Sequence, residues 1–208
     1  MIIKEDPFPH LIVNDFYNSQ ELELIWEELN FYTKPGKLLE AKDFGGIPDK
    51  TNSHAILLDS LYGKCVGKDV VSFRSISNIL KVNRKLFTST ATNIFSQIDD
   101  CCCIAEESNW DVTKVRYYHN EEYYEPHTDK SMQFLAFYYT YREPKKFTGG
   151  EVYFPKYDYQ PPLLNNSMII LPGWVEHGVN KVSIKDSDYY DGYGRYCISN
   201  FFGSQSRR

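Results

Sequence analysis

Two histidines and an aspartate stand out among the residues that could bind a metal ion. His127 and Asp129 lie two positions apart, and His177 follows 50 residues after His127. In an extended segment, residues i and i+2 point to the same side, so His127 and Asp129 can present an imidazole nitrogen and a carboxylate oxygen to one ion. With His177 as third ligand, three coordination positions stay open, which suits iron(II) that binds a chelating co-substrate and then oxygen.

The pattern alone leaves another class of protein open, because His-x-Asp tripeptides also occur in surface turns without a metal. In that alternative the chain is a non-catalytic jelly-roll binding module, whose three side chains hold a structural metal or satisfy hydrogen bonds. A cation opposite the ligands would separate the two classes, since a structural metal site has no use for it.

The second half of the chain has the pattern of a β-rich fold that could position these residues. Apolar, β-branched and aromatic runs recur after Trp110 and are separated by Pro and Gly turn signals. The expected strands cover residues 112–118, 134–141, 151–154, 168–171, 178–184 and 193–202. Short strands with turns between them are typical of a double-sheet barrel. We therefore expect an α+β, mainly β, single domain (1–208) with a double-stranded β-helix core of the jelly-roll, cupin-like kind over about residues 109–208.

The first half, about residues 1–108, is expected to supply helices that pack on one sheet. Asn18 and Glu21 have the spacing of a helix capping box, and apolar residues follow at helical intervals. Residues 34–68 are rich in Gly, Pro, Asp and Lys, which predicts a loop with a Phe-Gly-Gly turn in it. Residues 70–98 favour one or two amphipathic helices.

Composition narrows the range of partners and compartments. The 208 residues carry a formal net charge of -5, which argues against nucleic acid as a partner. The sequence has neither an apolar run long enough to span a membrane nor the apolar N-terminal stretch of a secretory signal. Its five cysteines, three of them in succession, are a poor disulfide framework. We expect a cytoplasmic protein without a membrane partner.

Motifs around the first two ligands match a known pattern. Tyr118 is followed by Tyr-Glu-Pro-His-Thr-Asp at 124–129, then by Phe-Tyr-Tyr at 137–139 and Gly-Gly-Glu-Val-Tyr-Phe at 149–154. These segments resemble those of the iron(II)- and 2-oxoglutarate-dependent oxygenases of the prolyl 4-hydroxylase type. Glu121 stands where many relatives have Gly.

The C-terminal motifs extend the resemblance over most of the chain. Met-Ile-Ile-Leu-Pro leads to His-Gly-Val at 177–179, and Gly-Arg at 194–195 opens a strand similar to the closing strand of the family. Arg195 follows His177 by 18 residues, about twice the usual separation. An insertion around residues 184–193 is implied, and its polar sequence, rich in turn-forming residues, predicts a longer hairpin loop.

The resemblance assigns a role to each candidate residue. The three ligands would hold iron(II), and Arg195 would bind the distal carboxylate of 2-oxoglutarate with a bidentate fork. Lys181 or Lys185 is the alternative cation for this role. Tyr139 would donate a hydrogen bond to the same carboxylate, and Tyr118 would also contact the co-substrate. Oxygen is the second co-substrate, and ascorbate is a candidate reductant.

The resemblance also implies a reaction, in which a substrate is hydroxylated while 2-oxoglutarate is converted to succinate and carbon dioxide. Asp129 favours hydroxylation, because relatives that transfer halide generally lack this carboxylate. The expected substrate is a prolyl residue in a peptide or protein. A small molecule or a nucleobase is the alternative, since it would use the same iron and 2-oxoglutarate residues and differ only in the loops.

Overall fold

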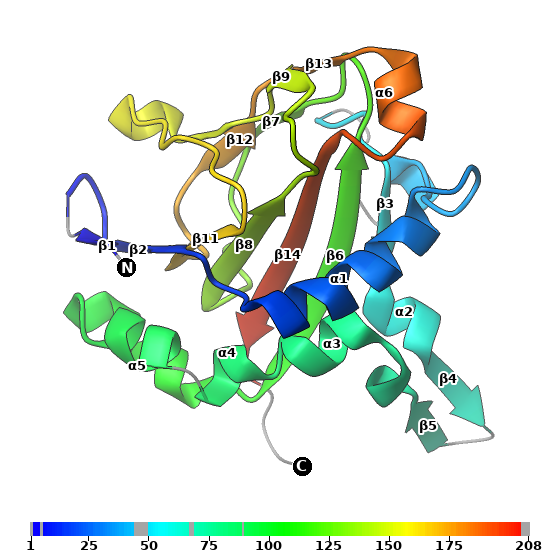
Figure 1. The fold of residues 1–208 in the computed structure, drawn as a ribbon. Helices are drawn as coiled ribbons and strands as arrows, with labels where there is room; N and C mark the ends of the chain where they lie inside the picture. The colour runs from blue at the N-terminus through cyan, green and yellow to red at the C-terminus, as the bar shows by residue number, and fades with distance from the viewer. Residues whose placement is uncertain (1, 5, 44–49, 67–68, 89, 205–208) are drawn as a thin grey trace.

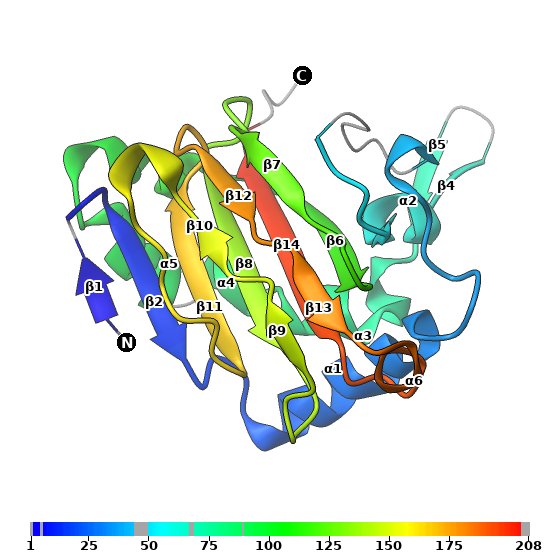
Figure 2. The same ribbon diagram turned by 90° about the horizontal axis from the view of Figure 1, so that it is seen from above.

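Two β-sheets face each other, and helices cover the outer side of the larger sheet (Figures 1 and 2). The computed structural model describes residues 2–4, 6–43, 50–66, 69–88 and 90–204. Within this part of the chain, the larger sheet has seven strands in the order β1-β2-β11-β8-β14-β6-β3, and the smaller has three in the order β10-β12-β7. The arrangement is that of a jelly roll with helices on one sheet, so the predicted fold class is confirmed.

The last strand of the larger sheet in chain order lies at its centre. In spatial order the strands are β1 (Ile2–Lys4), β2 (His10–Asn14), β11 (Ser167–Pro172), β8 (Phe134–Thr140), β14 (Arg195–Gly203), β6 (Trp110–Tyr118) and β3 (Ala55–Leu57). Every neighbouring pair is antiparallel. All residues of β14 are buried, and its register pairs Arg195 with Tyr118 and Ser199 with Lys114.

The remaining strands form short pairings. The smaller sheet contains β10 (Val152–Tyr153), β12 (His177–Val179) and β7 (Tyr124–His127), while β9 (Phe147–Gly149) pairs with β13 (Val182–Ile184) and β4 (Gly63–Val66) with β5 (Asp69–Ser72). The prediction of a single strand at 178–184 is therefore wrong. Asn180 and Lys181 interrupt it, and its two parts pair with different partners, which a local pattern does not reveal.

Side chains of the central strands alternate between two cores. On β8, Phe134 and Tyr138 pack with the helices, whereas Leu135 and Phe137 pack toward the smaller sheet. Because both faces of β8 are covered, its sequence is a continuous apolar run rather than an alternating one. The face toward the smaller sheet is the one that carries the candidate site.

The first long helix, α1 (Ser19–Tyr32), begins at the predicted capping box. The Asn18 side chain accepts a hydrogen bond from the Glu21 N–H, and the Glu21 carboxylate accepts one from the Asn18 N–H. Ile25 and Leu29, one turn apart, are fully buried against the larger sheet. None of the described helices is long and apolar enough to cross a membrane.

Residues 70–98 form several short helices rather than the one or two predicted. The chain passes from β5 through η2 (Arg74–Ile76) into α3 (Asn78–Val82), α4 (Lys85–Thr88), α5 (Thr90–Ser96) and the 3-10 helix η3 (Asp100–Glu107). Their apolar side chains join those of α1 on the same face of the larger sheet (Figure 1). The expected helical support is thus present, but divided into short pieces.

The prediction of a loop over residues 34–68 is wrong in part. It contains η1 (Ala41–Asp43), the edge strand β3 and the helix α2 (Leu58–Tyr62). Strand β3 pairs with β6, far along the chain, and three residues give no periodic signal of their own. Residues 44–49, with the predicted Phe-Gly-Gly turn, lie outside the described residues.

The hairpin loop predicted before β14 instead contains a short helix, α6 (Asp186–Tyr190). Tyr189 of this helix stacks on Tyr117 with 4.4 Å between ring centroids, and the Tyr117 hydroxyl donates to the Tyr189 carbonyl. The insertion therefore packs against the end of β6. Arg195 keeps its place as the first residue of β14.

Candidate metal and co-substrate site

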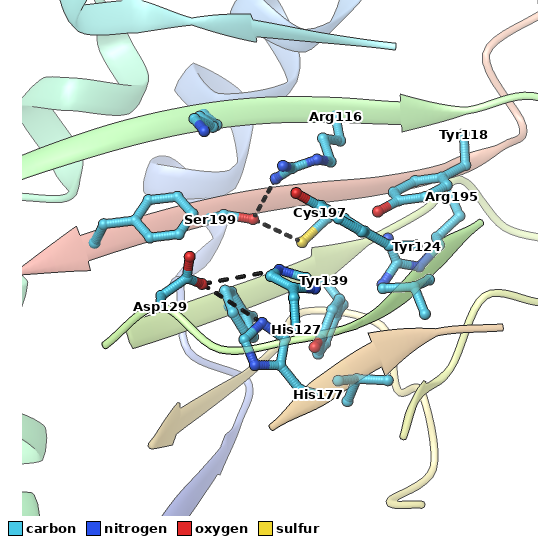
Figure 3. Close-up of a pocket in the computed structure, with 15 residues that line it drawn as sticks. Arg116, Tyr118, Tyr124, His127, Asp129, Tyr139, His177, Arg195, Cys197 and Ser199 are labelled. Carbon is cyan, nitrogen blue, oxygen red and sulfur yellow. Dashed lines mark hydrogen bonds and ion pairs between the residues drawn. The ribbon is translucent and has the colours of Figure 1, made fainter. Parts of the chain in front are cut away.

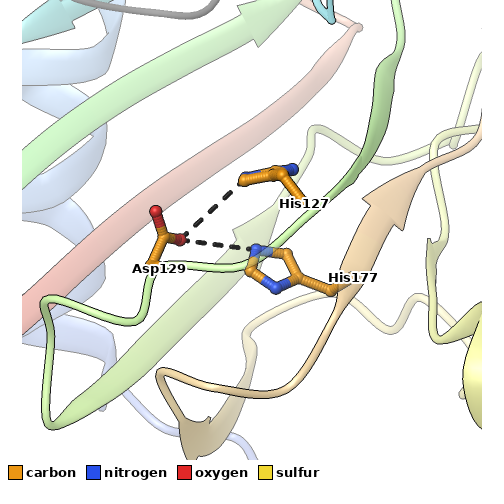
Figure 4. A group of neighbouring side chains, drawn as sticks. All are labelled: His127, Asp129 and His177. Atoms are coloured by element: carbon orange, nitrogen blue, oxygen red, sulfur yellow. Dashed lines mark ion pairs between the residues drawn. The ribbon is translucent and has the colours of Figure 1, made fainter.

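The smaller sheet and the loop after it bring the predicted metal ligands together. His127 ends β7 and His177 begins β12, and the two are paired directly across the sheet. Asp129 follows in the next loop, where its N–H donates to the carbonyl of Gly173 at 3.0 Å. One ligand atom from each of the three side chains lies within 4.8 Å of the other two (Figure 4).

The close approach of these two loops requires a glycine. A Cβ at Gly173 would lie 2.2 Å from the carbonyl oxygen of Met132 and 2.7 Å from that of Asp129. Both contacts are with backbone, which cannot move aside without displacing the loop. Gly173 therefore helps fix the distance between Asp129 and His177.

Both imidazoles present the same nitrogen to the site. Nδ1 of His127 lies 2.9 Å from the Glu125 carbonyl oxygen, and Nδ1 of His177 lies 2.9 Å from that of Val175. A carbonyl only accepts, so each Nδ1 carries the proton and each Nε2 keeps a free lone pair. The two Nε2 atoms lie 3.9 and 3.6 Å from Oδ2 of Asp129.

The electrostatics of these three side chains favour a bound cation. Burial lowers the pKa of His127 to about 3, and the nearby His177 adds to this effect. Burial also lowers the pKa of His177, against the opposing charge of Asp129, so both rings are neutral near pH 7. Oδ2 of Asp129 is buried without a hydrogen-bond partner among the described residues. Burying a carboxylate oxygen without a partner costs free energy. The three side chains therefore fit a site in which two histidines and one carboxylate bind a metal ion.

Arg195 supplies a buried cation at the other end of the same space. Its side chain is fully buried, and within the described part of the chain none of its guanidinium nitrogens has a hydrogen-bond partner. The guanidinium lies 4.4 Å from the ring centre of Tyr118 and 5.1 Å from that of Tyr139 (Figure 3). Arginine stays protonated in proteins, so this site fits a carboxylate that enters from outside.

Gly150 makes room for the Arg195 side chain. Its φ is +78°, and a Cβ there would lie 2.6 Å from Cδ of Arg195. The second glycine of the Gly-Gly motif is thus required both by the backbone and by the arginine that packs over it.

Glu121 shows a related backbone requirement in the turn before β7. Its φ is 64°, a left-handed conformation that glycine adopts without strain. The turn is held by the hydrogen bond from the Glu121 N–H to the Val182 carbonyl at 2.8 Å. Glu121 therefore has a backbone geometry that favours glycine.

The predicted site residues line one pocket, with about 450 Å³ of empty space that is partly open to solvent. The three metal ligands, Arg195, Tyr118 and Tyr139 all contribute to its walls. Lys181 instead forms an ion pair with Glu121 at the surface, at 3.3 Å. Neither Lys181 nor Lys185 is among the lining residues, so of these three candidate cations Arg195 is the one that lies in the pocket.

Two further cations line the pocket and are missing from the sequence-based prediction. Lys114 and Arg116 lie on β6, on the same side as Tyr118. Arg116 donates to Oγ of Ser199 at 3.2 Å, and its guanidinium lies 5.3 Å from the Tyr124 ring centre. The signal that could have found them is their period-two spacing with Tyr118 inside a predicted strand.

Comparison with known proteins shows similarity in fold. No family model matches the sequence, and no curated protein matches it. A prolyl-4-hydroxylase from Pseudomonas putida matches with a TM-score of 0.60 and 11% identity, over 94% of this chain and 92% of that chain. A prolyl hydroxylase from Trichoplax adhaerens, in complex with a hypoxia inducible factor peptide, matches with a TM-score of 0.57 and 12% identity. The match covers 93% of this chain and 82% of that chain. EctD from S. alaskensis, with 2-oxoglutarate and 5-hydroxyectoine, matches with a TM-score of 0.59 and 10% identity. The match covers 96% of this chain and 73% of that chain.

These matches identify the class of fold. The chain has a fold like that of prolyl hydroxylases and related 2-oxoglutarate-iron(II) oxygenases, as its motifs predicted. At such low identity the similarity concerns the fold alone. The roles of individual residues rest on the geometry of the pocket.

Proposed function

We propose that the chain is an iron(II)- and 2-oxoglutarate-dependent oxygenase that hydroxylates a prolyl residue in a peptide or protein. The observation that carries this proposal is the presence, in one pocket, of a 2-His-1-carboxylate group and a buried arginine whose guanidinium has no hydrogen-bond partner among the described residues. A structural metal site would need the first but not the second. The arginine therefore argues against the binding-module alternative.

The metal ligands and Arg195 would have separate tasks. His127, Asp129 and His177 would hold iron(II) through their free imidazole nitrogens and the carboxylate. Bound there, iron(II) with 2-oxoglutarate and oxygen supplies the oxidant that turns a substrate C–H into C–OH, as 2-oxoglutarate becomes succinate and carbon dioxide. Arg195 would orient 2-oxoglutarate through two parallel hydrogen bonds to its distal carboxylate.

Tyr118 and Tyr139 would complete the binding of that carboxylate. Burial raises the pKa of both hydroxyls, although the nearby Arg195 acts in the opposite direction, so both phenols stay protonated. A neutral phenol can donate a hydrogen bond to a carboxylate. The two rings also exclude water around the guanidinium, which strengthens its attraction for an anion.

The peptide substrate is supported by two of the matched folds. The proteins from Pseudomonas putida and Trichoplax adhaerens are prolyl hydroxylases, and the second is in complex with a peptide. The structure of EctD with 5-hydroxyectoine supports the alternative of a small-molecule substrate. Products from proline peptides and from small molecules would separate these two substrate classes.

The test is metal-dependent turnover with matched histidine variants. Metal-free protein would be supplied with iron(II), ascorbate, 2-oxoglutarate and oxygen, and succinate would be measured together with the mass of added proline peptides. We expect succinate only with iron(II), and a peptide heavier by one oxygen atom. His177→Ala and Asp129→Ala should reduce succinate to background because each removes a metal ligand. His54→Ala, outside the pocket, is the control.

Two outcomes would contradict the proposal. Normal succinate formation by the ligand variants would remove the metal assignment. Failure of the wild type to bind 2-oxoglutarate, measured by calorimetry without oxygen, would favour the non-catalytic module.

A further inference from the structure

Cys197 places a thiol in the pocket that contains the proposed iron and 2-oxoglutarate sites. Of the described residues that line this pocket, it alone carries a sulfur atom. Cys197 is 5% exposed, and its Sγ lies 3.4 Å from Oγ of Ser199 (Figure 3). Neither the proposed metal site nor the proposed binding of 2-oxoglutarate uses this thiol. A chemically reactive group is therefore left without a role in the reaction.

Strand geometry places this thiol beside Arg195. Cys197 follows Arg195 by two residues on β14, so both side chains point to the same side of the sheet. Tyr139 lies directly opposite Cys197 on β8, and directly opposed residues have Cβ atoms about 5 Å apart. The Arg195 guanidinium in turn lies 5.1 Å from the centre of the Tyr139 ring. The thiol and the guanidinium therefore border the same ring.

The electrostatics of the pocket agree with this placement. Burial acts to lower the pKa of Arg195, but the nearby Cys197 and the two tyrosines raise it, and the net shift is upward. Burial raises the pKa of Tyr139, and Cys197 adds to this effect. Cys197 is also among the groups that raise the pKa of Tyr118. The thiol thus lies near all three residues that are proposed to bind the distal carboxylate of 2-oxoglutarate.

Arg195 would bind an anion formed on Cys197 as readily as one that enters from outside. Its side chain is fully buried, and its guanidinium has no hydrogen-bond partner among the described residues. A cysteine sulfinate has two oxygens on one atom, as a carboxylate has. A guanidinium can bind such a pair of oxygens through parallel donors. The pocket is partly open to solvent, so a molecule as small as hydrogen peroxide can reach the thiol.

We propose that Cys197 is a modification site, at which hydrogen peroxide converts the thiol to a sulfinate that Arg195 then holds in place of 2-oxoglutarate. The loss of co-substrate binding rests on the proposed function. The modification itself and the ion pair with Arg195 do not, because they require only the residues of the pocket.

The oxidation consumes two molecules of peroxide in two steps. In the first, sulfur attacks one peroxide oxygen, the O–O bond breaks as the S–O bond forms, and the thiol proton leaves with the other oxygen as water. The second step adds another oxygen to the sulfenic acid and releases a second water. Each step takes two electrons from sulfur and reduces one peroxide. The sulfinic acid then gives its proton to solvent and becomes the anion.

Mass spectrometry of oxidised protein tests the modification directly. Metal-free protein, with a chelator to prevent radical formation by iron, would be treated with hydrogen peroxide and digested with trypsin. Cleavage after Arg195 gives a peptide that begins at Tyr196 and contains Cys197, no other cysteine and no methionine. We expect this peptide to become heavier by two oxygen atoms.

The consequence for the co-substrate is measured after catalase has removed the peroxide. Calorimetry with manganese(II) in place of iron(II) should show that 2-oxoglutarate binds oxidised protein at least about tenfold more weakly, because the charge-assisted bonds to Arg195 are lost. Cys197→Ser should keep its affinity through the same treatment. A double variant, Cys101→Ser with Cys103→Ser, removes two exposed thiols outside the pocket and should respond like the wild type.

A pair of variants tests the contact with Arg195 without peroxide. Cys197→Asp carries two oxygens on the atom bonded to Cβ, as the sulfinate does, and Cys197→Asn has the same shape without the charge. The Asp variant should bind 2-oxoglutarate at least about tenfold more weakly than the Asn variant. Without ligand it should also melt about 3 °C or more above the Asn variant, because it pairs with the buried guanidinium. Adding Arg195→Leu to both should abolish this difference in melting temperature.

Three outcomes would overturn the proposal. The first is a Tyr196 peptide without added oxygen while Cys101 and Cys103 are oxidised. The second is a peptide with two added oxygens and unchanged 2-oxoglutarate affinity, and the third is equal melting temperatures of the Asp and Asn variants. If Cys197→Asp does not fold, the mass and the affinity of oxidised wild type decide. Loss of 2-oxoglutarate binding by untreated wild type would instead overturn the proposed function, and the added mass and the melting temperatures would still test the sulfinate.

Discussion

The two faces of strands β6 and β14 have opposite characters, although they are made of alternating residues of the same strands. Toward the helices, Val115 and Ile198 are fully buried in an apolar core. Toward the smaller sheet, Arg116 and Arg195 are almost as deeply buried but carry charge. A strand can hold both kinds of residue because successive side chains point to opposite sides.

The difference shows that burial has a different consequence on each face. A buried aliphatic side chain stabilises the folded state by about 1.5–3 kcal/mol. A buried charge without a counter-ion destabilises it until a ligand enters. Substitutions of Ile198 and of Arg195 should therefore change the free energy of unfolding in opposite directions.

The largest effect is expected on the helix-facing side. Ile198→Ala removes a side chain that is 0% exposed and should lower the free energy of unfolding by about 2–5 kcal/mol, measured by denaturant titration. Because Ile198 points away from the pocket, the folded variant should keep its 2-oxoglutarate affinity. A loss below about 1 kcal/mol would contradict the assignment of this face as the main stabilising core.

On the pocket side, Arg195→Leu should raise the free energy of unfolding of the ligand-free protein, by about 1–4 kcal/mol, because it removes a buried charge. Saturating 2-oxoglutarate at 100 times its dissociation constant should stabilise the metal-bound wild type by about 2.7 kcal/mol and leave the variant unchanged. Arg195→Lys keeps the charge and loses the bidentate fork, so its ligand response should be intermediate. Destabilisation by Arg195→Leu would mean that the guanidinium already has a counter-ion in the folded chain.

A smaller effect is expected at Gly150, where the backbone and the pocket meet. Gly150→Ala should cost about 1–2 kcal/mol for the left-handed backbone and should also weaken 2-oxoglutarate binding, because the new Cβ displaces Arg195. Gly36→Ala is the matched control, since Gly36 has a similar φ of +73° with nothing within 4 Å of the added Cβ. Equal 2-oxoglutarate affinities of the two variants, measured by calorimetry, would refute the steric role of Gly150.

The sequence predicts what depends on local spacing. The placement of His127 and Asp129 on one side of an extended segment follows from their separation by two residues, and the capping box at Asn18 and Glu21 is likewise local. The strand pattern after Trp110 indicates the fold class for the same reason. The resemblance to a known family adds Arg195, and the approach of His177 and Arg195 to the other site residues depends on strand pairing.

What the sequence does not predict depends on distant partners. Strand β3 exists because β6 offers an edge, and residues 178–184 divide because β12 and β13 pair with different strands. Arg116 and Lys114 stand in a correctly predicted strand, but a charged residue there equally suits a solvated face. Only the position of the smaller sheet over β6 turns these positions into pocket walls.

The central position of β14 has a consequence for the order in which the molecule can assemble. Because β14 joins β8 to β6, the larger sheet consists of two unconnected parts, β1-β2-β11-β8 and β6-β3, until this late segment of the chain is available. During synthesis both inner edges would expose unpaired backbone groups, which favours wrong pairings between chains. The same strand carries Arg195, so the residue proposed to bind 2-oxoglutarate reaches its place when the larger sheet is completed.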